Sequence, residues 1–593
     1  MNSRNDAKQK GLNMSDFNWK RFGGLAGYSG KIAGVLFLCF SMIGMVHAQG
    51  PRTLMPDRVM PDSAYAMDIS NNWHISEDLP TNAALISLQG VVNQHSPQLY
   101  FIYPPDYKYT FAGALYEYYR DSRGIGFPRL PDLHAALRQF QDQVEGYVVW
   151  DTTQRTSLIV AYTIAGLEES IVVTGDQVSL AQEFGLEETA DLRGKFQGMT
   201  DAEIYRWAYQ RYWDRCSKEY IVYLGGASGK RMMPGVADFG MTKDAFFTDL
   251  SADPEDSAEY HLVNRLFREM EPMGMLMGWH SYAKDSESQL TTLASSYVLR
   301  TEGLNTLPNM SFNQYIPLSE GFEFENNHTV DPGKTYVPKK KVYLGLIQTD
   351  CLGIGSWLKP GRGKIPYAWE VTMNWVWLAP AMVEYFYEMA TPNDYFIGSL
   401  SGPGYMYPKA IPPAYRGEVA DSARALMETL DLRIFEIMDY SGNRPAFDRS
   451  EENADLPKSI VDTYYRHMPD ALGFVNGYGP AFTYDVREGR PFVSYDYYLS
   501  PERDAAEAAA DLEELARLNP KRPYFLLMHV RETSSVERVV GILDRLGPEF
   551  EVVALDRFMK MAGHTPTFQT RFLKNPLVQH RSPCTSCPDR NGK

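Results

Sequence analysis

Carboxyl side chains follow predicted strands at two places in the second half of the chain. Asp350 comes directly after the apolar run 341–349, and Asp439 comes after the run 432–438. A carboxylate at the end of a buried strand is explained more easily by a functional site than by solvation, because sites in parallel α/β folds lie at the carboxyl ends of strands. Two such groups can act as general acid and general base. Asp350 and Asp439 are therefore candidate catalytic residues. The alternatives are a helix N-cap or buried salt bridge for Asp350 and an Asx-turn for Asp439.

Other polar side chains also occupy predicted strand ends, so the sequence does not fix which two carboxyl groups would work together. We assign Glu370 and His529 to substrate binding. His529 could bind a hydroxyl group or a metal ion, the alternative being a histidine satisfied in the core. Glu436 is set aside, because its alternation is wrong if Asp439 points into the site. The remaining polar residues at these ends are Asn374, Asn476, Tyr478, Asp496, Arg531, Glu532 and Asp556.

A loop with the sequence Gly-Pro-Gly-Tyr-Met-Tyr-Pro, residues 402–408, follows a predicted buried strand at 394–400. Two glycines around a proline allow the backbone to adopt positive φ and to approach a ligand closely, which we expect at Gly404. Tyr405 and Tyr407 would then present flat faces to a bound ligand. In the alternative interpretation, both rings pin the loop to a neighbouring domain.

Two residues of the first half of the chain are candidates for the same site. Trp279 ends one predicted strand and Glu287 begins the next predicted helix. We expect both to contribute to substrate binding. Alternatively, Trp279 belongs to an interdomain core and Glu287 is a carboxylate in the first turn of a helix, where the helix dipole favours negative charge.

Strands and helices alternate along most of the chain, which is typical of a parallel sheet covered on both faces. Residues 81–320 are predicted to form a Rossmann-like α/β domain, without a dinucleotide site because no strand there is followed by GxGxxG. Residues 321–575 hold eight predicted strands with helices between most of them, which favours a (β/α) barrel. No clear helix separates the strands within 471–497, so an irregular or seven-stranded barrel fits equally well.

The composition limits the class of protein. The 593 residues contain 58 Lys and Arg against 74 Asp and Glu, a formal net charge of −16. This acidic balance argues against a nucleic-acid partner, which requires clustered basic residues. Hydrophobic residues make up 44% of the chain and aromatic residues 13%, which suits a large globular core.

The two ends of the chain differ from the rest. Residues 1–48 have the pattern of a signal peptide that is cleaved after Ala48, so we expect a secreted or periplasmic protein without a membrane partner. Residues 49–80 are predicted to be an extended arm, and residues 576–593 a tail that contains Cys584 and Cys587. Because a zinc site would need two more ligands at recognisable spacing, we interpret the pair as a local disulfide or as two cysteines without a structural role. No metal or other cofactor is predicted.

The loop at 402–408 matches, letter for letter, the motif that names the GxGYxYP family of putative glycoside hydrolases, mostly secreted bacterial proteins. The resemblance covers about 81–558. It implies a carbohydrate-active protein, a glycoside hydrolase that acts on an oligo- or polysaccharide through paired carboxylates at the mouth of the barrel. Further similarity to the family lies at Leu88–Asn93, at Gly278 and Trp279 with Glu287, at Ala379 and Pro380, and at Ala390–Asp394.

One departure from the family lies directly after Asp350. In the family this position opens an Asp-Gly-Asp-Asn run, whereas here Asp350 is followed by Cys-Leu-Gly. The loss of the second aspartate weakens any mechanism that requires it. Two alternatives therefore stay open: a non-catalytic glycan-binding protein on a degenerate barrel, and a metal-dependent polysaccharide deacetylase built around His529 and Asp350.

Overall fold

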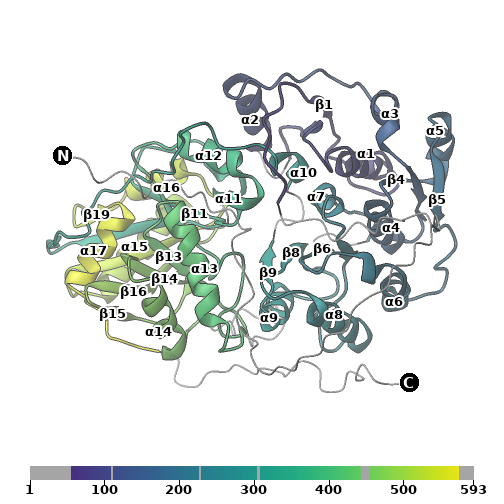
Figure 1. The fold of residues 1–593 in the computed structure, drawn as a ribbon. Helices are drawn as coiled ribbons and strands as arrows, with labels where there is room; N and C mark the ends of the chain where they lie inside the picture. Colours follow the sequence, from purple (N-terminus) through teal and green to yellow (C-terminus); the bar gives the residue numbers. More distant parts are fainter. Residues whose placement is uncertain are drawn as a thin grey trace, which may run out of the picture. The chain divides into compact units, whose positions relative to one another are not determined.

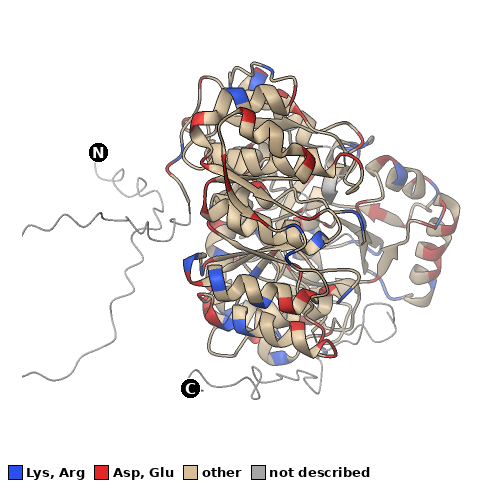
Figure 2. Cartoon of the chain, turned by 90° about the vertical axis from the view of Figure 1, so that its right-hand side faces the viewer, with Lys and Arg blue, Asp and Glu red and all other residues tan. Residues whose placement is uncertain are grey.

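The computed structural model describes residues 55–107, 111–225, 229–303, 307–350, 352–441 and 454–572. The predicted signal peptide and the tail with Cys584 and Cys587 lie outside these residues. Within the described part, no helix is long and apolar enough to cross a membrane. Lys and Arg are interspersed with Asp and Glu over the helices in the view of Figure 2.

The first sheet pairs a strand of the predicted arm with the first strand of the α/β region. β1 (Tyr65–Asp68) and β2 (Leu99–Ile102) are parallel. The segment 49–80 is therefore more than an extended arm, because its apolar residues Ala66 and Met67 are buried in this strand. The helices of this region are α1 (Leu79–Val92), α2 (Phe111–Glu117) and α3 (Leu133–Phe140).

Two further parallel sheets follow, with strand orders β4-β3-β5 and β7-β6-β8-β9. The strands predicted within 81–320 are thus shared among three sheets, because the hydrophobic pattern indicates strands but not which strands pair. The strands are β3 (Gly146–Val149), β4 (Ser170–Val173), β5 (Glu187–Asp191), β6 (Tyr220–Leu224), β7 (Phe246–Thr248), β8 (Met275–Trp279) and β9 (Arg300–Glu302). The helices are α4 (Arg155–Leu167), α5 (Val178–Glu183), α6 (Asp201–Tyr212), α7 (Ala237–Met241), α8 (Ser257–Glu269), α9 (Glu287–Ser296) and α10 (Met310–Asn313).

The second half of the chain builds one large mixed sheet with the order β15-β16-β14-β13-β12-β11-β10-β18-β17, in which β19 also pairs with β10. All of its ladders are parallel except β15 with β16. The strands are β10 (Val342–Gln348), β11 (Tyr367–Val371), β12 (Asp394–Gly398), β13 (Ile434–Ile437), β14 (Gly473–Pro480), β15 (Asp485–Arg487), β16 (Arg490–Tyr495), β17 (Tyr497–Leu499), β18 (Tyr524–Val530) and β19 (Phe550–Val552). The α/β class with parallel sheets is thereby confirmed.

Helices separate most of these strands and pack beside them, as α13 and α14 do beside β13 and β14 in Figure 1. The helices are α11 (Trp375–Leu378), α12 (Pro380–Glu388), α13 (Arg416–Thr429), α14 (Lys458–His467), α15 (Ala505–Leu518), α16 (Val536–Leu543) and α17 (Leu555–His564). The domain boundary expected at residue 321 stays a prediction. Asn326, just beyond it, already hydrogen-bonds the backbone of Phe396 in β12.

The chain itself connects two sides of the large sheet. β16 pairs with β14, and β17 pairs with β18 at the far end of the strand order. Only Asp496 separates β16 from β17. Its N–H donates to the carbonyl of Leu527 in β18 at 2.9 Å. Asp496 therefore connects β16, the second strand from one end of the order, with β17 at the other end.

Alternating residues of the large sheet face two different cores. One face carries a small apolar cluster that includes Ala368, Ile434, Val493 and Leu527, against which Phe558 of α17 packs. Side chains two residues further along a strand point to the same face. The residues that follow this apolar layer toward the carboxyl ends of the strands are Glu370, Glu436, Tyr495 and His529.

Candidate active site

Four carboxyl groups interact at the carboxyl ends of strands β10, β11, β13 and β18. Asp350 follows β10, Glu370 lies in β11, Glu436 lies in β13 and Glu532 follows β18. The two glutamates within strands are fully buried. The side chains of Asp350 and Glu532 are 19% and 28% exposed. This carboxyl cluster therefore extends from the interior of the sheet to the surface.

Glu370 and Glu436 form the inner pair. The Oε2 of Glu370 accepts the backbone N–H of Asp350 and the hydroxyl of Tyr478, each at 2.7 Å. Its Oε1 has no hydrogen-bond donor among the described residues, and Glu436 is close enough for the charge of Glu370 to act on it. Two neighbouring buried carboxyl groups disfavour ionisation of both at once.

The protonation of the inner pair follows from its surroundings. Burial raises the pKa of Glu370 to about 7, although hydrogen bonds from Tyr478 and the Asp350 backbone act against this rise. Burial and the charge of Glu370 raise the pKa of Glu436 well above its usual range. The hydroxyl of Tyr495 donates to both Glu436 oxygens, at 3.0 and 2.9 Å. Both glutamates are therefore protonated below about pH 7, and Glu436 keeps its proton to higher pH than Glu370 does.

Asp350 and Glu532 form the outer pair, with Arg531 between them. Arg531 lies 3.1 Å from the Asp350 carboxylate, and its Nε donates to Glu532 at 2.7 Å. Burial raises the pKa of Asp350 well above its usual range, although Arg531 acts against this rise. For Glu532, hydrogen bonding to Asp350 and the charge of Arg531 outweigh the effect of burial and lower the pKa to about 2. Glu532 is therefore the ionised member of the outer pair.

The backbone at Asp350 is unusual as well. Its φ of 63° lies in the left-handed region, which residues with a Cβ seldom adopt. Such conformations are concentrated at functional sites, where the surrounding structure holds them in place. This turn aims the N–H of Asp350 at Glu370 and so links the inner and outer pairs.

His529 is a neutral histidine beside the cluster. Its Nε2 lies 2.6 Å from the hydroxyl of Thr349, and the rings of Tyr478, Tyr495 and Tyr498 surround it at 5.0–5.1 Å. Burial and the nearby charge of Arg531 lower the pKa of His529 to about 3. Among the described residues, no group of three or more His, Cys, Asp or Glu side chains is arranged to hold a metal ion.

Asp439 lies beyond the end of β13 and is engaged by its own neighbours. It accepts the backbone N–H of Lys409 at 2.6 Å and the backbone N–H of Ser441 at 2.8 Å. The Lys409 ammonium lies 3.5 Å away. The bond from Ser441, two residues on, is that of an Asx-turn. These contacts favour the turn interpretation of Asp439 over a catalytic role.

The two tyrosines of the loop at 402–408 are buried and hydrogen-bonded inside the protein. The hydroxyl of Tyr405 donates to Glu287, the first residue of α9, and lies 3.0 Å from the hydroxyl of Tyr407. The ring of Tyr405 is stacked on Trp279 with 6.1 Å between ring centroids. The backbone of Tyr405 also exchanges two hydrogen bonds with Thr301 of β9. The structure thus brings together the four residues expected at one ligand site, in contacts that favour packing.

The glycines of this loop do not have positive φ, contrary to the expectation for Gly404. Left-handed φ values occur instead at Leu400 and Ser401, in the turn that follows β12. Hydrogen bonds between the Ser401 side chain and the backbone of Met438 fix this turn. A Cβ at Gly404 would lie 3.0 Å from the Cβ of Arg300, so close packing explains this glycine.

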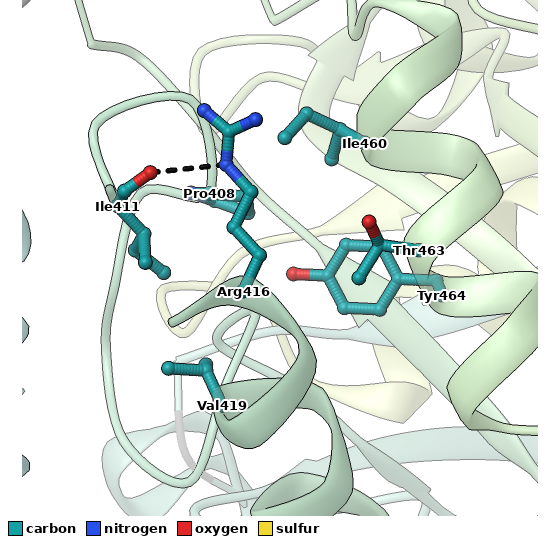
Figure 3. Close-up of a pocket in the computed structure, with 7 residues that line it drawn as sticks. All are labelled: Pro408, Ile411, Arg416, Val419, Ile460, Thr463 and Tyr464. Atoms are coloured by element: carbon teal, nitrogen blue, oxygen red, sulfur yellow. Dashed lines mark hydrogen bonds between the residues drawn. The ribbon is translucent and has the colours of Figure 1, made fainter. Parts of the chain in front are cut away.

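Pro408, the last residue of the motif, borders a very small cavity (Figure 3). Tyr464 lines the same cavity, together with Arg416, whose Nε donates to the carbonyl of Ile411 at 3.0 Å. The cavity has a volume of about 10 Å³. This is the space of roughly one water molecule, so a sugar ring does not fit there.

Of the four carboxyl groups, the sequence predicts Asp350 as a catalytic residue and Glu370 as a substrate-binding residue, but it predicts no role for Glu436 and Glu532. Glu436 has the alternation of Ile434, which faces the interior, and this signal was available in the sequence. Asp439 has the opposite alternation, so a prediction that directs Asp439 into the site excludes Glu436. No comparable signal distinguishes Glu532, which lies beyond the end of β18.

Four models of one family match the chain in succession. The first, second and third N-terminal domains of GxGYxYP proteins match residues 64–142, 144–216 and 218–314. The GxGYxYP putative glycoside hydrolase C-terminal domain matches residues 340–563. The chain therefore belongs to the GxGYxYP family.

The structure is also similar to a solved one. It superposes on the crystal structure of a putative hydrolase from Bacteroides thetaiotaomicron with a TM-score of 0.70 and 16% sequence identity, over 88% of this chain and 98% of that chain. At this identity the likeness establishes the shared fold. No curated protein matches the sequence.

Proposed function

We propose that this protein is a glycoside hydrolase in which Glu370 is the general acid and Glu532 is the ionised carboxylate. The observation that carries the proposal is the pairing of four carboxyl groups, in which the pKa of one is raised to about 7 and that of another is lowered to about 2. Cleavage of a glycosidic bond requires such a combination of protonated and ionised carboxyl groups. Membership of the GxGYxYP family supports a carbohydrate as the substrate.

The two catalytic carboxyl groups must come from different pairs. In a contact pair the oxygens are too close for a sugar, because glycosidases separate the two groups by about 5–5.5 Å or about 6.5–9.5 Å. Glu370 is the more acidic member of the inner pair and Glu532 the ionised member of the outer pair. The backbone N–H of Asp350 donates to Glu370, and the carboxyl group of Asp350 interacts with Glu532. Asp350 therefore stands between the two catalytic groups.

In the proposed reaction Glu370 donates a proton to the leaving oxygen as the glycosidic bond breaks. Glu532 acts from the opposite face of the sugar ring, where it either attacks the anomeric carbon or takes a proton from an attacking water. Arg531 keeps Glu532 ionised in the resting enzyme. Tyr478 and the N–H of Asp350 stabilise the Glu370 carboxylate that remains after proton transfer. The configuration of the released sugar distinguishes the two routes.

The proposal extends to the form and location of the protein. We propose that the large sheet is an irregular barrel, because the chain passes from β16 to β17 at Asp496 and so joins the ends of the strand order. The signal-peptide pattern of residues 1–48 supports export. Sequencing the amino terminus of the exported protein tests this part, and a mature chain that retains residues before Ala48 would contradict it.

A reducing-end assay on a panel of oligo- and polysaccharides tests the function. We expect at least one substrate to be cleaved, with an alkaline limb of kcat/KM near pH 7, because Glu370 must be protonated to act as the acid. The Glu370→Gln variant should lose about 10²–10⁴-fold in kcat. The matched control is Glu302→Gln, because Glu302 is also buried with a pKa raised to about 7 but lies in β9.

Two results would count against the proposal. Full activity in the Glu370→Gln variant would remove the assigned acid. Saturable binding of a glycan without any release of reducing ends would favour the alternative, a glycan-binding protein.

A further inference from the structure

A second cavity lies between strands β16 and β18, at a distance from the carboxyl cluster along both strands. Its volume is about 410 Å³, within the range of small-molecule sites. It contacts β18 at Tyr524, Phe525 and Leu527, whereas the carboxyl cluster adjoins the opposite end of this strand. The function proposed above makes no use of this cavity.

The cavity exists because β16 and β18 do not pair along their first residues. β16 pairs with β14 and β15, and β18 pairs with β10. The first link between them is Asp496, whose N–H donates to the carbonyl of Leu527 and whose carboxylate accepts the N–H of Leu527, both at 2.9 Å. The space before this link is walled by side chains instead of by a strand ladder.

The side chains that line the cavity are buried at its floor and exposed at its mouth. The floor includes Val493 and Leu527, both almost fully buried, whereas Phe482 and Leu518 at the mouth are 56% and 60% exposed. Ligand sites are lined mainly by apolar and aromatic side chains with a few polar groups among them, and this lining has that composition. The ring of Tyr484 lies 5.3 Å from that of Phe568, which adds a flat wall inside the mouth.

Arg571 and Asp496, two polar groups of the cavity, are held in place by contacts with its walls. Arg571 exchanges two backbone hydrogen bonds with Tyr484, and its guanidinium lies 4.2 Å from the centre of the Phe482 ring. Lys521 lines the same mouth. Neither cation forms an ion pair with a carboxylate of the described residues. Asp496, the carboxyl group of the lining, accepts the hydroxyl of Tyr524 at 3.2 Å.

We propose that this cavity is a second carbohydrate site, which binds a pyranose ring carrying a carboxylate. The aromatic walls match the apolar face of a sugar ring, and Asp496 offers a hydrogen-bond acceptor to its hydroxyl groups. Lys521 and Arg571 supply the charge for the carboxylate, in a protein whose net charge is −16. The choice of a sugar rests on the proposed function, whereas the preference for an anion rests on the two cations alone.

Calorimetric titration of the full-length mature protein with glucuronic acid and with glucose tests the proposal. To exclude turnover, the titrations use the Glu370→Gln variant as the parent. We expect glucuronate to bind about fivefold or more tightly than glucose. An ion pair at a solvent-exposed position changes a dissociation constant by about this factor. The Arg571→Gln and Lys521→Gln substitutions should each reduce this preference.

The Phe482→Ala substitution should weaken the binding of both sugars about tenfold by removing an aromatic wall. Its matched control is Tyr282→Ala, because Tyr282 is 58% exposed but lies outside the cavity. Both side chains are exposed, so we expect the variants to remain folded, and thermal melting checks this. Lys521→Gln also changes an exposed side chain. Its effect on the preference for glucuronate is a second test that does not depend on the aromatic wall.

Three outcomes would overturn the proposal: no binding of either sugar at about 50 mM, equal binding of both, or glucuronate binding that is unchanged by Phe482→Ala and Arg571→Gln. The test is separate from that of hydrolysis. If the glycan panel shows no cleavage but cavity variants weaken glucuronate binding, the carboxyl cluster has been misassigned and the second site stands.

Discussion

The carboxyl cluster and the GxGYxYP loop lie at the ends of neighbouring strands but satisfy their polar groups in different ways. In the loop, which follows β12, the hydroxyls of Tyr405 and Tyr407 bond each other and Glu287. In the cluster, on β11 and β13 to either side, burial raises the pKa values of both Glu370 and Glu436. The loop is complete without a ligand, whereas the cluster keeps carboxyl groups close together at a cost in stability.

This difference separates a residue that is important for folding from one that is poised for chemistry. A buried hydroxyl with a partner contributes to stability and gains little from a substrate. Crowded buried carboxyl groups have shifted pKa values, and such shifts are concentrated at functional sites. The motif that names the family therefore indicates packing between the two halves of the chain, and the carboxyl cluster indicates function.

The largest expected effect is the loss of turnover in Glu532→Gln. Removing the ionised carboxylate should lower kcat by about 10³-fold, with a melting temperature near that of the wild type because glutamine has the same shape. Steady-state kinetics and thermal melting measure the two quantities. The contrasting variant is Asp439→Asn, which disturbs the bonds to Lys409 and Ser441 and should lower stability while turnover persists. The reverse pattern would place the chemistry at Asp439.

The second largest effect is a loss of stability when the loop at 402–408 is changed. Tyr407→Ala removes a fully buried ring and should lower the free energy of unfolding by about 3–5 kcal/mol. The kcat of the fraction that stays folded should remain within about threefold of the wild type, because no step is assigned to this side chain. Chemical denaturation and kinetics at low temperature test this. A stable Tyr407→Ala variant that has lost turnover would return the loop to the active site.

The positions of helices and strands could be predicted from the sequence better than the pairing of the strands. Strand β18 and helix α14 are readable from the sequence, because each has a clear apolar period and clear ends. The division of the first half into three sheets is not, since parallel pairing depends on how the connecting helices pack. Helix α7 has only five residues, too few to show a helical period.

The candidate site could be predicted in part for a related reason. Asp350 and Glu370 were identified because strand ends are readable from the pattern of apolar residues. The role of Glu436 depends on which face of β13 turns inward, which the alternation of Glu436 and Asp439 in the sequence leaves open. The contacts of Glu532 with Arg531 and Asp350 join β18 to β10 and require the three-dimensional fold.

A third test shifts the pH dependence of the cluster without removing a carboxyl group. The hydrogen bond from Tyr478 favours the ionised form of Glu370 and so lowers its pKa. Tyr478→Phe should therefore raise that pKa, keep the acid protonated to higher pH, and move the alkaline limb of kcat/KM upward by about one pH unit. The acidic limb, which depends on Glu532, should stay in place. An alkaline limb that moves down, or both limbs moving together, would contradict the assignment of Glu370 as the acid.

The smallest effect is expected at Gly404, the central glycine of the motif. Its φ is not left-handed, so alanine is compatible with the backbone, and the new Cβ would meet the Cβ of Arg300 at 3.0 Å. The neighbour must move by a few tenths of an ångström, while alanine also restricts the unfolded chain and offsets part of this cost. We expect Gly404→Ala to lower the free energy of unfolding by about 1 kcal/mol or less.

Gly278 provides the contrast, because its φ is 110° and a Cβ there would lie 2.0 Å from the carbonyl oxygen of Tyr223. Gly278→Ala should therefore be much the more damaging of the two when both are compared by denaturant unfolding. If Gly404→Ala proves equally damaging, or abolishes turnover in a folded protein, the loop at 402–408 is more than a packing element.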